Sequence, residues 1–243
     1  GDVYKRQAQY VKAYVKRNKN DAADAEAICE AVARPTMRFV PAKTAEQQAA
    51  VLLHRGRERL VRQRTMLVNA LRGHLAEFGV IAPQGLRNVG RLIAIIRDEK
   101  DARLPGLARQ VLQVLAVQIE QLEAAIAALE KQLMGWHKSN PVSQRLATIP
   151  GIGPIIATAI AAMVAEPSGF RSGREFAAWL GLVPRQNSTG GKNRLGGISK
   201  RGNQYLRRLL INGASANLLR SKATNADPWV IGCLLYTSPS PRD

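Results

Sequence analysis

The chain has 243 residues, and 36 Lys or Arg against 18 Asp or Glu give it a formal charge of +18 at pH 7. An excess of this size points to a polyanionic partner, of which nucleic acid is the common case. No apolar run approaches the roughly 20 residues that a membrane span needs, so we expect no membrane partner. Outside residues 233–243 the only cysteine is Cys29, which excludes a disulfide framework there and fits a reducing cytoplasm.

The two ends of the chain carry matching coding information. Gly1–Gln7 can be encoded by a string whose reverse complement, shifted by one base, translates as Cys233–Pro239. Two ends of a natural protein have no reason to encode each other's antisense strand, and the string resembles a sequencing-library adapter. We therefore treat residues 1–7 and 233–243 as adapter-derived and non-native, and expect them to pack poorly.

The first predicted helix begins after Asn20, which is a good N-cap, and runs to about Ala33, where Pro35 stops it. Cys29 lies among alanines in this helix and is expected to be a small buried residue rather than a nucleophile. Met37–Pro41 is predicted as a short strand.

Two long helices are predicted next. Thr44 and Gln47 form a capping box that opens a helix ending near Gly79, with Leu53 and Leu60 on one side. A segment punctuated by Gly and Pro leads into a second long helix, where apolar residues recur with 3–4 spacing over three heptads. They are Leu112, Leu115, Ile119, Leu122, Ile126, Leu129 and Leu133. This pattern indicates a coiled-coil or antiparallel hairpin seam, or an ordinary amphipathic helix packing on residues 44–79.

A glycine turn between two apolar helices opens the last region. Ile149–Pro154 has the sequence Ile-Pro-Gly-Ile-Gly-Pro and resembles a helix–hairpin–helix, in which glycine amides at a helix N-terminus hold a phosphate without reading bases. We assign Gly151 and Gly153 to this contact. A plain Gly-rich helix turn is the alternative.

Gly181–Leu210 is the most informative segment, because it contains seven Lys or Arg, six Gly and no acidic residue. Flexible backbone and dense positive charge suit a surface that binds phosphodiester oxygens. Ser188 and Thr189 are hydroxyl nucleophiles with cations on either side, so the segment is either a phosphoryl-transfer site or a loop that only binds nucleic acid. The predicted nucleic-acid contacts here are Arg185, Lys192, Arg194, Lys200, Arg201 and Arg207.

Asp21 and Asp24 stand out against the basic background. Spaced i, i+3 at the start of a helix, they project from one face, as paired carboxylates that hold Mg²⁺ do. They are equally explained as first-turn acids that favour the helix dipole. His54, His74 and His137 lack metal-ligand spacing and are expected to be surface or helix residues.

Three features occur in order: the sequence KNDAADA at residues 19–25, the Pro-Gly-Ile-Gly turn, and Gly181–Leu210. Together they closely resemble the insertion-sequence transposases of the "one-ten" family and its "eleven-eleven" subgroup, the DEDD recombinases, over residues 8–232. The resemblance implies a mainly α fold with three parts. These are the remnant of a RuvC-like α/β domain (8–43), a helical coiled-coil linker (44–137), and a truncated C-terminal transposase domain with a helix–hairpin–helix-like element (138–232).

The resemblance also implies a chemistry. The family binds Mg²⁺ with four acids, of which Asp21 and Asp24 match the third and fourth, and it carries a serine nucleophile that Ser188 matches best. Thr189 is the alternative, one position later. The first Asp and the Glu of the quartet belong upstream of residue 8, so we expect this fragment to be inactive.

The predicted function is therefore that of a transposase or site-specific recombinase, which cuts and rejoins DNA through a covalent phosphoserine. The resemblance adds a structured non-coding guide RNA of the bridge type as a partner. We also expect a homo-oligomer in the bacterial cytoplasm, associated with the nucleoid. Two alternatives stay open: a non-catalytic nucleic-acid-binding protein, and a RuvC-type junction resolvase that uses metal-activated water and no serine.

Overall fold

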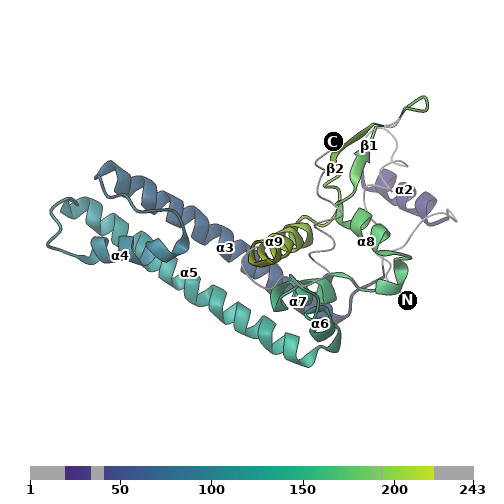
Figure 1. The fold of residues 1–243 in the computed structure, drawn as a ribbon, viewed down its shortest axis with the longest axis horizontal. Coiled ribbons are helices and arrows are strands. Elements are labelled where there is room, and N and C mark those ends of the chain that lie inside the picture. Colours follow the sequence, from purple (N-terminus) through teal and green to yellow (C-terminus); the bar gives the residue numbers. More distant parts are fainter. Residues whose placement is uncertain (1–19, 34–40, 188, 193, 222–243) are drawn as a thin grey trace. The chain divides into compact units, whose positions relative to one another are not determined.

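The computed structural model describes residues 20–33, 41–187, 189–192 and 194–221, and within them the protein is mainly helical with one two-stranded sheet (Figure 1). The predicted mainly α fold is thus confirmed. Three predictions fall on residues outside the described ones: the two ends interpreted as adapter-derived, the strand predicted at Met37–Pro41 except for its last residue, and the predicted nucleophile Ser188.

The chain divides into two compact units. One lies within Gly1–Gln48 and Ala161–Arg207, and the other within Ala49–Ile160 and Arg208–Asp243. The domain boundaries inferred from the sequence stay a prediction.

Helix α2 spans Asp21–Ala33, as the sequence predicts. The Asn20 side chain caps it, because its Oδ1 accepts a hydrogen bond from the Ala23 amide at 2.7 Å. Ala27 and Ala31, one turn apart, form the buried face. Cys29 is exposed, so the expectation of a buried cysteine is wrong. It lies two positions from each alanine, and two positions along a helix turn a side chain to the opposite face.

Helix α3 spans Ala45–Glu77 and begins with the predicted capping box. The Gln47 amide donates to Thr44 Oγ1 at 3.1 Å, and the Thr44 amide donates to Gln47 Oε1 at 3.0 Å. Gly79 follows two residues after the end of the helix, and its φ of 72° is the left-handed conformation that glycine adopts without strain.

The segment after α3 holds more structure than the sequence predicts. A 3₁₀ turn, η2 (Leu86–Asn88), and a short helix, α4 (Val89–Arg97), precede the second long helix, α5 (Gly106–Ser139). The buried side chain of Arg109 explains the break, because its guanidinium donates to the carbonyl oxygens of Ile96 at 2.8 Å and Asp101 at 2.6 Å. These carbonyls belong to the end of α4 and the loop after it, so Arg109 stabilises a chain reversal that no periodicity reveals.

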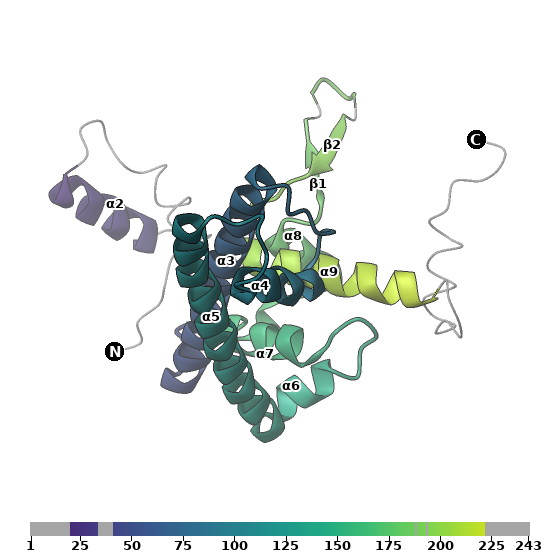
Figure 2. The same cartoon turned by 90° about the vertical axis from the view of Figure 1, so that its left-hand side faces the viewer.

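The heptad positions of α5 face α3 and α4. Their a-type residues are all at most 4% exposed, while the intervening three are half-buried. The a-type residues are Leu112, Ile119, Ile126 and Leu133. Arg57 on α3 pairs with Glu130 on α5, and Leu71 and Leu75 share a core cluster with Leu112 and Ile119. The two helices are therefore antiparallel, and the helical-hairpin interpretation of the heptads is confirmed (Figure 2).

An 18-residue window of α5 has a mean hydropathy of 1.4, so this helix is long and apolar enough to cross a membrane by length and composition. That differs from the expectation drawn from the sequence. Burial in the helical hairpin accounts for only part of this apolar character: 22% of the window is buried, whereas Val111 and Val114 are 57% and 58% exposed.

The remaining helices are short, apart from the last. The bounds are α6 (Pro141–Leu146), α7 (Pro154–Met163), η3 (Pro167–Gly169), α8 (Gly173–Leu180) and α9 (Gln204–Ser221). The two strands are β1 (Pro184–Gln186) and β2 (Leu195–Ile198), paired antiparallel.

His54 connects α3 to α7. Its Nε2 lies 3.1 Å from Thr158 Oγ1, and the threonine hydroxyl itself donates to the Pro154 carbonyl at 2.7 Å. The hydroxyl has one proton, so His54 donates and Thr158 accepts. Burial first, and the charge of Arg57 second, lower the pKa of His54 to about 4. His54 is therefore a neutral core residue, and not a surface one.

Candidate nucleic-acid interface

The base of the interface is a tight crossing of two backbone segments. Helix α8 ends at Gly181, which has a φ of 73°, and a Cβ on Gly181 would lie 2.7 Å from the Arg201 nitrogen. A Cβ on Gly202 would overlap the carbonyl of Trp179. Only glycine fits these two positions, because each has another main chain where a side chain would begin. The two glycines therefore anchor both ends of the strand pair that lies between them.

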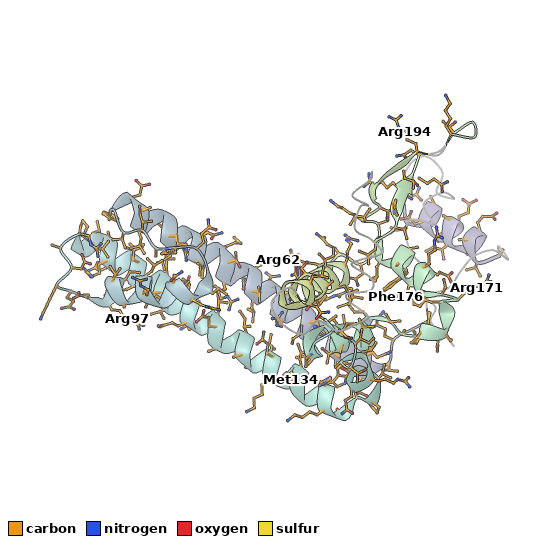
Figure 3. All side chains as sticks on the ribbon, viewed as in Figure 1. Arg62, Arg97, Met134, Arg171, Phe176 and Arg194 are labelled. Carbon is orange, nitrogen blue, oxygen red and sulfur yellow. The ribbon has the colours of Figure 1, made fainter. Side chains whose placement is uncertain are left out.

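A cluster of three aromatic rings supports α8 beneath this crossing. The ring centroids of Phe170 and Phe176 lie 5.2 Å apart in an edge-to-face contact, and Phe176 stacks on Trp179 at 5.8 Å. Phe176 is labelled in Figure 3. Such pairs contribute beyond their buried area. They give the small unit a core that holds the end of α8 in place.

Strands β1 and β2 form a projecting β-ribbon, which we define as residues 184–198. Its tip is the Gly190–Gly191 pair, whose φ values of 55° and 79° are those of a type I′ turn. Thr189 and Lys192 pair on either side of the tip, and the Asn187 amide donates to the Arg194 carbonyl at 2.8 Å. Every described residue of the strands is exposed except Ile198, which is half-buried.

The pairing of the ribbon collects its polar side chains on one face. Directly paired residues of an antiparallel pair project to the same side, and residues two apart in a strand share that side. The pairs Thr189–Lys192 and Asn187–Arg194 therefore lie on one face, and Arg185 follows two positions before Asn187. The register shift in β2 comes after Leu195, so it does not disturb this set. Three cations, one amide and one hydroxyl share the face.

The sequence segment that contains the ribbon carries positive charge only. The sequence has no Asp or Glu between Glu175 and Asp227. Glu175 is itself engaged at the start of α8, where its Oε2 accepts from the Arg171 amide at 2.8 Å. A two-stranded ribbon is also narrow enough for the major groove of a DNA duplex. The arrangement can therefore hold a polyanion along an exposed, cation-bearing face.

The other three predicted contacts in this segment differ in their exposure to solvent. Lys200 and Arg201 are exposed, and Lys200 adopts a φ of 55°, which is unusual for a residue with a side chain. Arg207 is 8% exposed and donates from Nη1 to the Leu180 carbonyl at 2.8 Å. Its guanidinium is buried in the fold, so Arg207 does not belong to the exposed cationic surface predicted from the sequence.

The predicted phosphate-binding turn lies in the other compact unit, between α6 and α7. Gly151 has a φ of 83°, and its carbonyl lies against Gly213 of α9, so closely that a Cβ on Gly213 would overlap it. Gly153 is exposed at the N-terminus of α7. Of the two glycines, Gly151 therefore serves the close packing of the turn on α9, and Gly153 presents its backbone to solvent.

The acidic pair lies in the first turn of α2. Asp21 is exposed and Asp24 half-buried, and neither forms an ion pair with another described residue. No group of three or more His, Cys, Asp or Glu that could hold a metal ion occurs in the described part of the chain. The pair does fit part of a Mg²⁺ site, because this ion is commonly bound by one or two carboxylates together with water and phosphate oxygens.

Asn187 is the residue that the sequence interpretation missed. The signal was present: a Gly-Gly pair between Thr189 and Lys192 is a two-residue hairpin pattern, and it fixes which side chains share a face. The segment was instead interpreted as a flexible loop, in which no face can be assigned.

Comparisons with known proteins agree with the resemblance stated above. A family model described as "Transposase IS116/IS110/IS902 family" matches residues 143–228, and a second, described as a transposase of the DEDD type, matches residues 3–80. Over 93% of its length the chain is 51% identical to a "Probable family 20 transposase" of Pseudomonas aeruginosa, covering 68% of that protein.

Two further relatives are transposases of named insertion sequences. The chain is 42% identical over 93% of its length to that of IS1328 from Yersinia enterocolitica, and covers 67% of it. It is 41% identical over 91% of its length to that of IS1111A from Coxiella burnetii, and covers 62% of it. The chain thus spans roughly two thirds of the length of these relatives.

Proposed function

The chain belongs to the IS116/IS110/IS902 family of transposases, and from this premise we propose that it is part of an enzyme that cuts and rejoins DNA at the ends of an insertion sequence. The observation that carries the proposal is the β-ribbon, whose one face bears Arg185, Lys192 and Arg194 around the hydroxyl of Thr189. This combination suits phosphoryl transfer as well as charge neutralisation, because it places a hydroxyl, that of the alternative nucleophile Thr189, among groups that stabilise negative charge.

The three cations have a defined role in this proposal. They hold the phosphodiester against the ribbon and stabilise the charge that develops on its non-bridging oxygens as the new bond forms. The glycines at the tip allow the DNA backbone to approach the ribbon closely. The exposed amide of Gly153 would hold a second phosphate at the start of α7.

Ser188 is the proposed nucleophile, with Thr189 as the alternative. The hydroxyl attacks the phosphorus, a covalent phosphoester forms, and the leaving 3′ or 5′ oxygen takes up a proton. A serine hydroxyl needs a base to remove its own proton, and residues 181–210 contain no His. The base must therefore come from another part of the protein or from another subunit.

Asp21 and Asp24 are the carboxylates that we propose for the metal site that acts with this nucleophile. They would hold Mg²⁺, which when bound supplies positive charge to phosphoryl oxygens. Their own contribution is to present two acceptor groups on one face of α2, in the first turn. The family resemblance adds four further points to the proposal. The full-length protein carries the other two acids of the quartet and binds a bridge-type guide RNA. It also assembles into a homo-oligomer and lies in the bacterial nucleoid.

The test is the capture of a covalent protein–DNA adduct. A relative carrying all four acids is incubated with labelled DNA from the ends of its element, and adduct is detected on a denaturing gel. Variants are Ser→Ala at the position of Ser188 and, separately, Thr→Ala or its equivalent at the position of Thr189. Loss of adduct with the first change alone supports Ser188, and loss with the second alone assigns Thr189.

Other outcomes favour the alternatives. Cleavage that persists without adduct in both variants indicates a RuvC-type resolvase that uses water. DNA binding without cleavage in the unmodified relative indicates a non-catalytic binding protein. An Asp→Asn change at the position of Asp21 should abolish Mg²⁺-dependent cleavage and spare binding; wild-type cleavage would return the pair to its role as helix-start acids.

A further inference from the structure

A second group of exposed cations belongs to helices α3 and α9. Arg55, Arg59 and Arg62 of α3 are all exposed. Spacings of four and three residues place them on one side of the helix, over a length of about 10 Å at 1.5 Å per residue. We call these three residues, with Arg208 of α9, the arginine stripe.

Glu58 forms ion pairs with two arginines of the stripe. Its Oε1 accepts from Arg62 Nη2 and from Arg208 Nη2, each at 2.8 Å. The carboxylate is mostly buried, with 19% of its side chain exposed, whereas the side chains of Arg62 and Arg208 are 62% and 43% exposed. One acid thus fixes two guanidiniums at the surface where α3 meets α9, and much of each remains in solvent.

The stripe keeps a large excess of positive charge. Four arginines face one glutamate, which leaves a net charge of +3. Within the described residues, Arg55 and Arg59 form no ion pair. Other arginines of the same helices are engaged inside the fold: Arg57 with Glu130, and Arg72 with the carbonyls of Pro83 and Gly85. The fold therefore gives no internal explanation for Arg55 and Arg59.

We propose that the arginine stripe binds the phosphodiester backbone of duplex DNA, as a second contact surface on the helical hairpin. Guanidinium groups bind phosphate with two parallel hydrogen bonds, and the stripe faces a length of duplex that carries about six backbone charges. The choice of DNA among polyanions rests on the proposed function.

The absence of aromatic side chains on α3 favours duplex over single-stranded nucleic acid as the partner of the stripe. Single-strand binding depends on aromatic side chains that stack on unpaired bases. Residues 45–77 of α3 contain no Phe, Tyr or Trp. The stripe offers charge without a stacking surface, so it contacts backbone and reads no base.

The experiment measures how the affinity of the full chain for a 40-base-pair DNA duplex depends on salt. The variant is Arg55→Gln with Arg59→Gln. The matched control is Arg97→Gln with Arg103→Gln, which removes the same charge from arginines paired with Glu120 and Asp101 (Arg97 is marked in Figure 3). Thermal melting checks that both variants remain folded.

The stripe variant should lower the slope of log affinity against log salt by about 2, since each lost phosphate contact removes about 0.9, and should weaken binding roughly tenfold. The control should retain most of the affinity. Equal behaviour of the two variants overturns the proposal.

A third variant, Lys192→Gln with Arg194→Gln, separates this proposal from the one above. Weak binding by the ribbon variant and normal binding by the stripe variant overturns the stripe alone. The reverse result supports the stripe and counts against the ribbon. An RNA duplex and a single-stranded DNA of the same length are run in parallel. If the stripe variant loses affinity only for the RNA duplex or only for the single-stranded DNA, the assignment to duplex DNA is overturned.

Discussion

The helical hairpin and the β-ribbon use arginine in opposite ways. At the tip of the hairpin, Arg72 and Arg109 donate to backbone carbonyls and hold loops in place. On the ribbon, Arg185 and Arg194 are exposed in a segment without a single acid, and Arg185 makes only long hydrogen bonds of 3.4 Å, to the Ser199 carbonyl. The comparison teaches that net charge identifies a class of partner, but only burial and hydrogen-bond partners identify which cations are available to it.

The difference has a physical cause. A guanidinium carries five donors and does not lose its proton, so a buried arginine must find acceptors for most of them. The chain reversals after α3 and α4 expose helix-end carbonyls, which need donors. The ribbon satisfies its own backbone by strand pairing, and its cationic side chains stay exposed at the surface, with Arg185 donating to the Ser199 carbonyl at 3.4 Å.

The largest expected difference is between a substitution of a buried arginine in the hairpin and one of an exposed arginine on the ribbon. Arg109→Gln should destabilise the protein by about 3–5 kcal/mol, because several buried carbonyls lose their donor at once. Arg194→Gln should change the free energy of unfolding by less than about 0.5 kcal/mol, as exposed substitutions do. Urea unfolding followed by circular dichroism measures both. Similar losses in the two variants would show that the ribbon cations are structural too.

The seam of the helical hairpin gives the next largest effect. Leu122→Asp places a charge at a half-buried heptad position and should weaken folding or self-association by about 2–3 kcal/mol. Thermal melting and sedimentation velocity report the two quantities separately. If stability and oligomeric state were both unchanged, residue 122 would lie outside the seam.

His54 adds a pH dependence to the hairpin that the ribbon should lack. Its pKa is about 6.5 in the unfolded chain and about 4 in the fold, so the unfolded state binds more protons between these values. The contribution of neutral His54 is complete above pH 6.5 and is lost as the pH falls to 4, by about 2–3 kcal/mol in total. Unfolding measured from pH 7 to 4 should show a smaller decline in His54→Gln than in the unmodified chain. Identical declines would mean that other groups titrate.

A single ribbon cation should give the smallest effect. Lys192→Gln should lower the salt slope of DNA binding by about 1 and leave stability unchanged, because Lys192 is exposed beside the tip. The same change at Lys131, exposed on α5, is the control and should leave the slope unaltered. A slope that falls equally in both would indicate a general charge effect.

Much of the helical architecture followed from local sequence signals. The caps at Asn20 and Thr44 and the heptads of α5 depend on neighbours a few residues away, and the structure confirms them. The break between α4 and α5 depends on Arg109 reaching carbonyls up to 14 residues earlier, which periodicity cannot show. The burial of His54 likewise depends on Thr158, over 100 residues away.

The candidate site was predicted in part. The basic segment and the glycines were evident in composition, but the shared face of Asn187, Thr189 and the cations required the strand register. Arg207 illustrates the limit, since one more arginine in a basic run carries no local sign that Leu180 will accept its hydrogen bond.

The most direct test of the account is the salt dependence of DNA binding in the triple variant Arg185→Gln, Lys192→Gln, Arg194→Gln. The account predicts that the slope of log affinity against log salt falls by about 3 in magnitude, while the free energy of unfolding stays within about 0.5 kcal/mol of the unmodified chain. An unchanged slope with unchanged affinity would contradict the claim that the cationic face of the ribbon holds the DNA backbone.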